Sequence, residues 1–255
     1  MTDSSRIARR FNNAAASYDA HSALQRHAAQ HLAELIERAR LPAAPRILEI
    51  GCGTGHLTEQ LHSRFADANY LATDIAPAMV SACRRRLPGL HHAAMDGERP
   101  ATAGGFDLVC SSLTAQWFRD LPATIARLTE LLAPGGVLAL ALVGEDTFGE
   151  WRAAHRVFGL QPGTPQFPSA PQLRSLFPAA GQFDLEEETH VDRQHSPLDF
   201  LRTLRGIGAD TPAPGHRPLS AGDLRRVLRQ LGDAPAITYH LLYAAWRKPP
   251  VQAEA

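Results

Sequence analysis

The feature that most constrains this chain is a glycine-rich segment, Leu48–Gly55 (LEIGCGTG), set between an apolar run and a helical stretch. Arg46–Ile50 predicts a strand, and residues 55–65 predict the helix that follows it. Three glycines at alternate positions let the backbone turn tightly and come close to a ligand. The helix that starts there offers unpaired N–H groups and the positive end of its dipole. This turn is therefore suited to an anionic group such as a carboxylate.

The same order of short apolar runs and helical stretches continues to about residue 146. Apolar residues at helical spacing indicate helices, and short apolar runs bounded by polar or glycine-rich turns indicate buried strands. Strands alternating with helices are typical of a doubly wound, mostly parallel sheet in an α/β fold. The predicted strands are Asn69–Thr73, 90–94, Phe106–Ser111 and Val137–Val143, and the predicted helices are Pro77–Leu87 and Leu121–Leu132.

The remainder of the chain divides into blocks around this central half. We expect an N-terminal helical cap over residues 1–45, with helices at 5–17 and 21–40, and a cofactor-binding half over 46–146. Less regular sequence over 147–235 predicts an acceptor-site insertion with a strand at 183–190 and helices near 197–207 and 220–231. Residues 236–248 predict a final strand, and 249–255 a disordered tail.

Charge and cysteine usage exclude several classes of function. The chain has 255 residues with 26 basic and 26 acidic side chains, so neither nucleic acid nor an anionic membrane is an expected partner. Cys52, Cys83 and Cys110 show no paired or metal-ligand spacing, so no metal is expected. Scattered thiols, no signal peptide and no long apolar stretch predict a cytoplasmic protein.

The glycine spacing and three acids favour one cofactor. A dinucleotide fingerprint would read Gly-x-Gly-x-x-Gly, whereas here Glu49 precedes Gly-x-Gly-x-Gly, which favours S-adenosylmethionine. Asp74 follows the second strand, where a carboxylate can accept from both ribose hydroxyls; the alternative is a helix N-cap. Asp96 follows the third strand and can accept from an adenine amino group, or be an ordinary loop residue.

Segments outside this pattern give a narrower resemblance. Ala8–Gln25, Ser111–Phe118, Leu201–Ala209 and Ile237–Leu241 resemble the malonyl-acyl-carrier-protein O-methyltransferases, a branch of the class I S-adenosylmethionine-dependent methyltransferases that acts in biotin synthesis. The resemblance runs from about residue 6 to 247. That family often has Asn where Ser112 stands and an aliphatic residue where Thr114 stands.

The resemblance implies methyl transfer to the free carboxylate of malonyl-acyl carrier protein, with S-adenosylhomocysteine as product. The product would start the synthesis of a pimeloyl precursor of biotin. The resemblance also implies further residues of the cofactor site. The complete expected site comprises Tyr18, Gln25, Glu49, Gly51, Cys52, Gly53, Gly55, Asp74, Ile75, Met79, Asp96, Gly97, Ser111 and Gln116.

The acceptor chemistry limits which side chains are needed. A carboxylate is already ionised at neutral pH, so we expect no general base. Arg202 and Arg205 lie three apart on a helical stretch and could clamp the substrate carboxylate, or be a solvated face. Tyr18 would close over the cofactor, or pack in the cap. Two other functions stay open: a small-molecule carboxyl or other O-methyltransferase, and a non-catalytic S-adenosylmethionine-binding protein.

Overall fold

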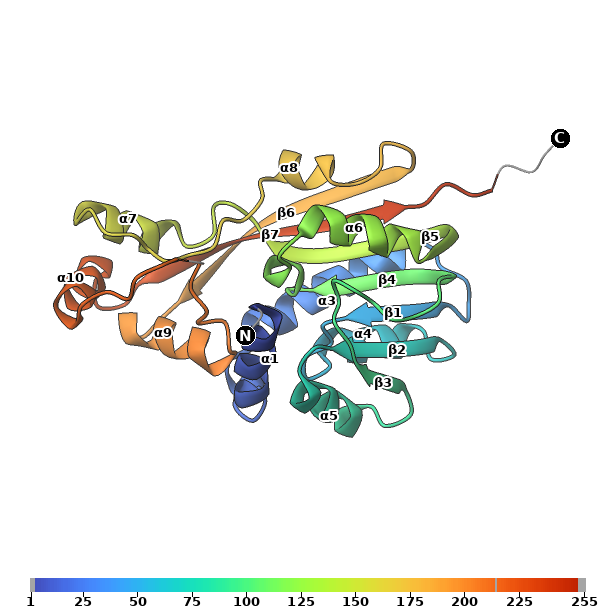
Figure 1. The fold of residues 1–255 in the computed structure, drawn as a ribbon, viewed down its shortest axis with the longest axis horizontal. Coiled ribbons are helices and arrows are strands. Elements are labelled where there is room, and N and C mark those ends of the chain that lie inside the picture. The colour runs from blue at the N-terminus through green and yellow to red at the C-terminus, as the bar shows by residue number, and fades with distance from the viewer. Residues whose placement is uncertain (1–2, 214, 252–255) are drawn as a thin grey trace.

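The computed structural model describes residues 3–213 and 215–251, and these form one mixed sheet covered by helices (Figure 1). The seven strands lie in the order β3-β2-β1-β4-β5-β7-β6. All pairs from β3 to β5 are parallel, while β7 runs antiparallel to both of its neighbours. The strands are β1 Arg46–Ile50, β2 Asn69–Asp74, β3 His91–Ala94, β4 Phe106–Ser112, β5 Leu132–Val143, β6 Gln182–Arg193 and β7 Ala236–Arg247.

Helices bury their apolar faces on both sides of the sheet. Successive strand residues point to opposite faces, so Ile47 joins one core cluster and Leu48 the other. The first cluster packs against α3, α4 and α5, and the second packs against α6 and α8. These helices are α3 Ala23–Arg38, α4 His56–Arg64, α5 Pro77–Arg86, α6 Leu121–Glu130 and α8 Ala170–Ser175.

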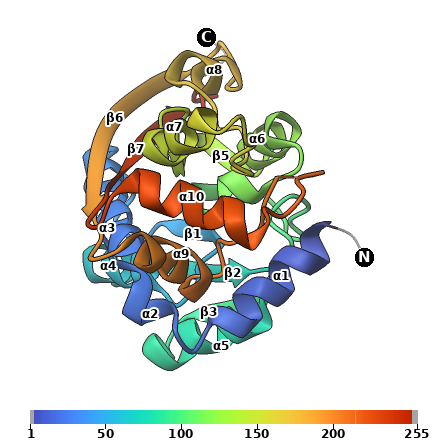
Figure 2. The ribbon, with the colours of Figure 1, turned by 90° about the vertical axis from the view of Figure 1, so that its left-hand side faces the viewer.

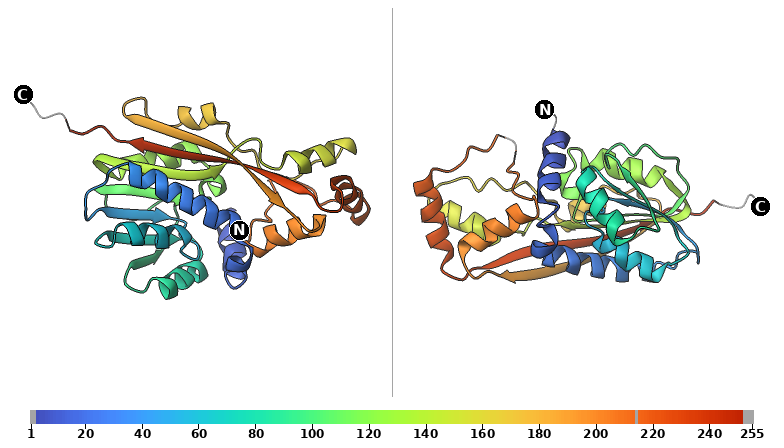
Figure 3. Two further views of the ribbon diagram at one scale, coloured as in Figure 1. Left: turned by 180° about the vertical axis from the view of Figure 1, so that it is seen from behind. Right: turned by 90° about the horizontal axis from the view of Figure 1, so that it is seen from below.

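The long strands β6 and β7 extend past the rest of the sheet and carry a second group of helices (Figures 1 and 3). This group comprises α7 Gly149–Val157, α9 Pro197–Gly206 and α10 Ala221–Leu231. Figure 2 shows α9 beside the N-terminal helices α1 (Asp3–Ala14) and α2 (Tyr18–His21). Helix α9 meets the N-terminal helices at Ser17, whose Oγ donates to the Gly206 carbonyl at 3.0 Å.

The α/β class and the mostly parallel sheet are confirmed, as are the helices expected near 197–207 and 220–231. The helix expected over 5–17 is present as α1 but ends at Ala14, because a turn in which Ser17 N donates to the Ala14 carbonyl follows it. Helices α7 and α8 were not expected, and β6 is longer than the strand predicted at 183–190. Of the tail expected at 249–255, residues 252–255 lie outside the described residues.

No helix among the described residues has both the length and the apolar character needed to cross a membrane.

Candidate functional site

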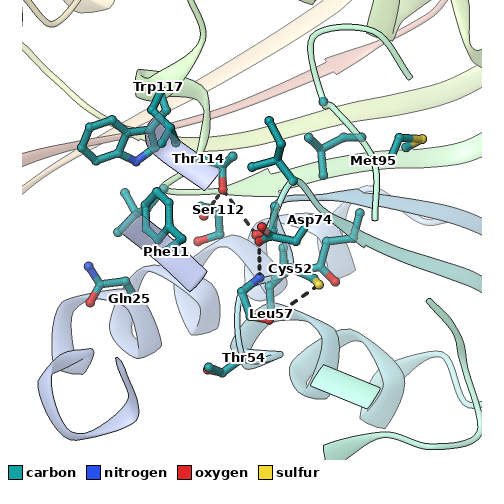
Figure 4. Close-up of a pocket in the computed structure, with 18 of the residues that line it drawn as sticks. Phe11, Gln25, Cys52, Thr54, Leu57, Asp74, Met95, Ser112, Thr114 and Trp117 are labelled. Carbon is teal, nitrogen blue, oxygen red and sulfur yellow. Dashed lines mark hydrogen bonds between the residues drawn. The ribbon is translucent and has the colours of Figure 1, made fainter. Parts of the chain in front are cut away.

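A pocket lies at the carboxyl ends of β1, β2 and β4, beneath the N-terminal helices (Figure 4). It encloses about 870 Å³ of space, part of it open to solvent. In open α/β sheets, ligands bind at this edge. The lining residues are Ser4, Ile7, Phe11, Tyr18, Gln25, Ala29, Glu49 to Thr54, His56, Leu57, Asp74, Ile75, Met95 to Glu98, Ser112 to Thr114, Trp117 and Phe118.

The glycine loop forms the floor of this pocket. Gly51 and Gly53 have φ angles of +74° and +54°, which residues with a Cβ adopt only at a cost. The loop is held to β2 because Cys52 N donates to the Thr73 carbonyl at 2.8 Å. Its backbone conformation therefore depends on glycine and on the neighbouring strand.

Asp74, the last residue of β2, is fixed by backbone donors. Gly53 N donates to its Oδ2 at 3.0 Å and Ala76 N donates to its Oδ1 at 2.8 Å. The N-cap of α5 is Ala76, not Asp74, so the alternative of a helix-capping role for Asp74 is wrong. Figure 4 shows the carboxylate near the middle of the drawn residues, with Phe11 and Trp117 toward one end and Met95 toward the other.

Two of the pocket acids are buried without a cationic partner. Burial raises the pKa of Asp74 to about 6, although two backbone hydrogen bonds oppose the shift. Burial also raises the pKa of Glu49 to about 7, while hydroxyl donation from Tyr70 (2.6 Å) and Thr58 (2.7 Å) opposes it. Within residues 3–213 and 215–251, neither acid forms a salt bridge. A cationic ligand would relieve the cost of burying both charges.

The other two acids of the lining differ from this pair. Asp96 Oδ1 accepts from Glu98 N at 3.0 Å, which shapes the turn after β3. The carboxylate of Glu98 accepts from Arg119 Nε at 3.1 Å and from the backbone N–H groups of Arg119 and Asp120. Asp96 is therefore the acid of this turn that stays available to a ligand, while Glu98 supports the turn.

Unpaired polar atoms in the wall indicate a polar ligand. Ser112 Oγ and Gln25 Oε1 line the pocket, are shielded from solvent, and have no hydrogen-bond partner among the described residues. Buried polar groups are normally paired, so these two atoms are suited to a molecule that brings its own donors and acceptors. The residues present therefore fit S-adenosylmethionine, which carries a sulfonium, an ammonium, hydroxyls and an amino group.

The N-terminal helices supply the remaining wall. Ser4, Ile7 and Phe11 line the pocket from one face of α1. Their spacing of three and four residues is a sequence signal for a shared helix face, and it could have identified them. Phe11 packs edge-on against Trp117, with ring centroids 5.7 Å apart. Trp117 is thus a wall residue.

The structure brings most of the expected cofactor residues together, but not all. Gly55 is the N-cap of α4 with φ +99°, and a Cβ on it would lie 3.1 Å from Cys83 Sγ rather than in the pocket. Met79 is fully buried in α5, and the hydroxyl of Ser111 is occupied by the Ile50 carbonyl at 2.8 Å. Gln116 donates to the Leu113 carbonyl at 2.8 Å. The remaining expected residues all line the pocket: Tyr18, Gln25, Glu49, Gly51, Cys52, Gly53, Asp74, Ile75, Asp96 and Gly97.

The two arginines expected to clamp the substrate lie outside this lining. Arg202 is 69% exposed and pairs with Asp199 at 2.8 Å, and Arg205 is 82% exposed and lies 3.8 Å from Asp210. Both are on α9, which contacts α2. A clamp from either residue would require the side chain to leave its acidic partner.

One group of metal-ligating side chains lies elsewhere in the described part of the chain. The ligand atoms of His27, Glu188 and His190 are within 4.8 Å of one another, between α3 and β6. Glu188 already pairs with His27 at 2.6 Å and accepts from the Tyr243 hydroxyl at 3.0 Å. None of these residues lines the pocket.

Comparison with known proteins shows to which family this chain is related. A family model described as a methyltransferase domain matches residues 48–138. The biotin biosynthesis bifunctional protein BioCD of Bordetella avium is 49% identical over 95% of this chain, and the chain spans about half (52%) of that protein. The malonyl-[acyl-carrier protein] O-methyltransferase of Magnetococcus marinus is 39% identical, with 95% of this chain and 92% of that protein covered.

The chain belongs to the malonyl-[acyl-carrier protein] O-methyltransferase family. A further member, from Halorhodospira halophila, is 33% identical over 94% of this chain and 86% of its own. Membership makes the chain an S-adenosylmethionine-dependent methyltransferase, as the glycine loop and the strand-end acids predicted.

Solved structures agree with this methyltransferase family in fold. The YcgJ protein of Bacillus subtilis superposes with a TM-score of 0.63 at 14% identity, covering 86% of this chain and 98% of that one. The plantazolicin methyltransferase BpumL, solved in complex with SAH, gives 0.56 at 14% identity, covering 96% and 95%. Their identities are too low to say more than that the fold is shared.

Proposed function

We propose that this protein transfers a methyl group from S-adenosylmethionine to the free carboxylate of malonyl-acyl carrier protein, in the cytoplasm, giving the methyl ester that starts pimeloyl synthesis. The main observation in favour of S-adenosylmethionine as the methyl donor is the negative charge of the pocket. Four carboxyl groups line it, and the described lining contains no Lys or Arg. The proposal that malonyl-acyl carrier protein is the methyl acceptor rests on family membership.

The only imidazole in the described lining is unsuited to hold an anion. Burial and the neighbouring Arg86 guanidinium lower the pKa of His56 to about 4, so this side chain is neutral at physiological pH. The lining therefore supplies no positive side chain to the acceptor carboxylate. Its counter-charge within the pocket has to come from the donor, and outside the pocket from an arginine such as Arg202.

The residues present can align the reactants without moving a proton. S-adenosylmethionine, when bound, supplies a methyl group on a cationic sulfur. Asp74 and Glu49 would hold the donor by its polar groups, while Phe11, Trp117 and Tyr18 cover the pocket and exclude water. Alignment of oxygen, methyl and sulfur accounts for much of the rate of such transfers, and a dehydrated carboxylate is the better nucleophile.

A methyl-transfer assay with labelled S-adenosylmethionine tests the acceptor. We expect labelled methyl ester on malonyl-acyl carrier protein, with much slower transfer to malonyl-coenzyme A and none to free malonate. Equal transfer to free acids would favour a small-molecule carboxyl methyltransferase. Binding of the donor with no transfer to any of the three would favour a non-catalytic binding protein.

Replacing Arg202 with Ala should impair methylation while leaving donor affinity unchanged. Loss of a charge-assisted hydrogen bond costs about 1.5–3 kcal/mol, so kcat/KM for malonyl-acyl carrier protein should fall about tenfold or more. Arg205→Ala tests the other candidate, and Arg156→Ala, an exposed arginine on α7, serves as control. Normal turnover in both α9 variants would mean that another group holds the carboxylate.

A further inference from the structure

The short helix α2 covers the glycine loop without being buried itself. It has no buried residue, yet it carries Tyr18, which lines the pocket beside Gly53. A Cβ on Gly53 would lie only 3.9 Å from the Tyr18 hydroxyl. Apolar burial therefore contributes little to holding α2 in this position, and polar contacts have to hold it.

Asp19, the next residue along α2, makes those contacts. Its Oδ1 accepts from Thr54 Oγ1 at 2.5 Å, and Thr54 belongs to the glycine loop. Its Oδ2 accepts from Arg86 Nη2 at 2.7 Å, at the last residue of α5. One carboxylate thus joins α2 to the loop and to the helix that follows β2, although Asp19 does not line the pocket.

We infer that Asp19 is a positioning residue whose carboxylate latches α2 over the glycine loop and sets how long the bound donor or product stays in the pocket. This inference rests on the proposed function, because it presupposes an S-adenosyl ligand between Tyr18 and the loop. Asp19 acts through Tyr18 and Thr54 and does not itself touch the ligand.

The rest of the cap has separate attachments that do not depend on Asp19. Asn12 Oδ1 accepts from Ala78 N at 2.8 Å and so ties α1 to the start of α5. Ser17 Oγ, at the N-cap of α2, donates to the Gly206 carbonyl at the end of α9. Loss of the Asp19 carboxylate should therefore free α2 from the loop while α1 stays in place.

The test is the release rate of S-adenosylhomocysteine from Asp19→Asn, measured by stopped-flow displacement without any acyl carrier protein. Asn offers one acceptor oxygen, so either Thr54 or Arg86 loses its partner. We expect release about tenfold faster than wild type, with KM for S-adenosylmethionine raised to a similar extent and kcat changed less than about twofold.

Glu37→Gln is the matched control. Glu37 is an exposed acid that pairs with Arg64 at 3.1 Å between α3 and α4, and neither residue lines the pocket. It removes a comparable ion pair between helices and should leave release unchanged. Urea unfolding of both variants checks that they remain folded.

Arg86→Gln gives a second, independent variant. It should reproduce the faster release, and the double variant with Asp19→Asn should add little, because both remove the same interaction. All rates are compared at about pH 8, where His56, which lies 3.1 Å from Arg86, is neutral with or without the guanidinium. Release from Asp19→Asn and Arg86→Gln as slow as from Glu37→Gln would overturn the latch alone. Failure of the wild type to bind S-adenosylhomocysteine would overturn the proposed function together with it.

Discussion

Replacing Asp74 with Asn should weaken S-adenosylmethionine binding about 100-fold and, above about pH 6, should remove a destabilising charge from the ligand-free protein. The two hydrogen bonds that a carboxylate would accept from ribose hydroxyls are charge-assisted, each worth about 1.5 kcal/mol or more. Together they account for roughly two orders of magnitude in affinity. Calorimetric titration measures the affinity, and an unchanged dissociation constant would refute the ribose assignment.

The effect on stability follows from the raised pKa. Folding shifts the pKa of Asp74 from 3.8 to about 6, so between these values the folded state holds more protons than the unfolded state. Stability therefore falls as pH rises through this window, by about 3 kcal/mol in all. Asn does not titrate, so the stability of Asp74→Asn relative to wild type should rise by about that amount between about pH 4 and about pH 8.

This pH comparison separates charge from lost hydrogen bonding. Asn can accept only one of the two backbone donations from Gly53 and Ala76, and that loss is the same at every pH. Urea unfolding across the window isolates the titrating part. Asp107→Asn is the control, because Asp107 also accepts from a backbone N–H (Arg46 N, 2.8 Å) but lies at the amino end of β4. A pH-independent difference for Asp74→Asn would mean that folding does not raise the pKa of Asp74.

Replacing Gly51 with Ala should be the most damaging single change in the glycine loop. A Cβ there would lie 2.1 Å from Thr114 Oγ1 and 2.7 Å from Thr114 Cβ. Rotation of Thr114 can move the hydroxyl but not its Cβ, so the backbone has to shift. With the cost of a positive φ, about 1–2 kcal/mol, we expect a loss of about 3 kcal/mol or more in unfolding free energy, and loss of donor binding.

Two further variants divide this cost into its parts. Gly135 has a similar φ of +79° but nothing within 4 Å of a Cβ, so Gly135→Ala measures the backbone cost alone. Thr114→Gly removes the three atoms that lie nearest to the new methyl group, so it should restore most of the stability lost in Gly51→Ala. Equal losses in Gly51→Ala and Gly135→Ala would show that the contact with Thr114 is unimportant.

The cofactor half could be predicted because its signals are local. The glycine loop, the strand before it and the acids at strand ends are each contained within a few residues of the chain. Asp74 follows an apolar run that has to be a strand, and the carboxyl end of that strand has to meet the glycine loop. Fold and donor site therefore followed from short-range patterns.

The acceptor side and the latch could not be predicted in the same way. Helix α7 begins after Phe148, an N-cap residue with φ +63° and no side-chain cap hydrogen bond, so its start carries no sequence signal. Polar side chains of β6 form hydrogen bonds with residues of α3 that are more than 150 positions away in the sequence, as His31 does with Glu186. Asp19 likewise reaches Arg86 across 67 positions. Contacts of this kind depend on the assembled tertiary structure.

The antiparallel direction of β7 determines which terminus is suited to a fusion tag. Arg247 pairs with Val137 of β5, whose other neighbour, Leu108, lies near the amino end of β4. Polypeptide joined beyond Arg247 therefore starts at the edge of the sheet opposite the pocket. Ser4, by contrast, is part of the pocket wall, so a purification tag or fluorophore fused ahead of it would begin at the entrance. Fusions and surface tethering should therefore use the carboxyl-terminal side.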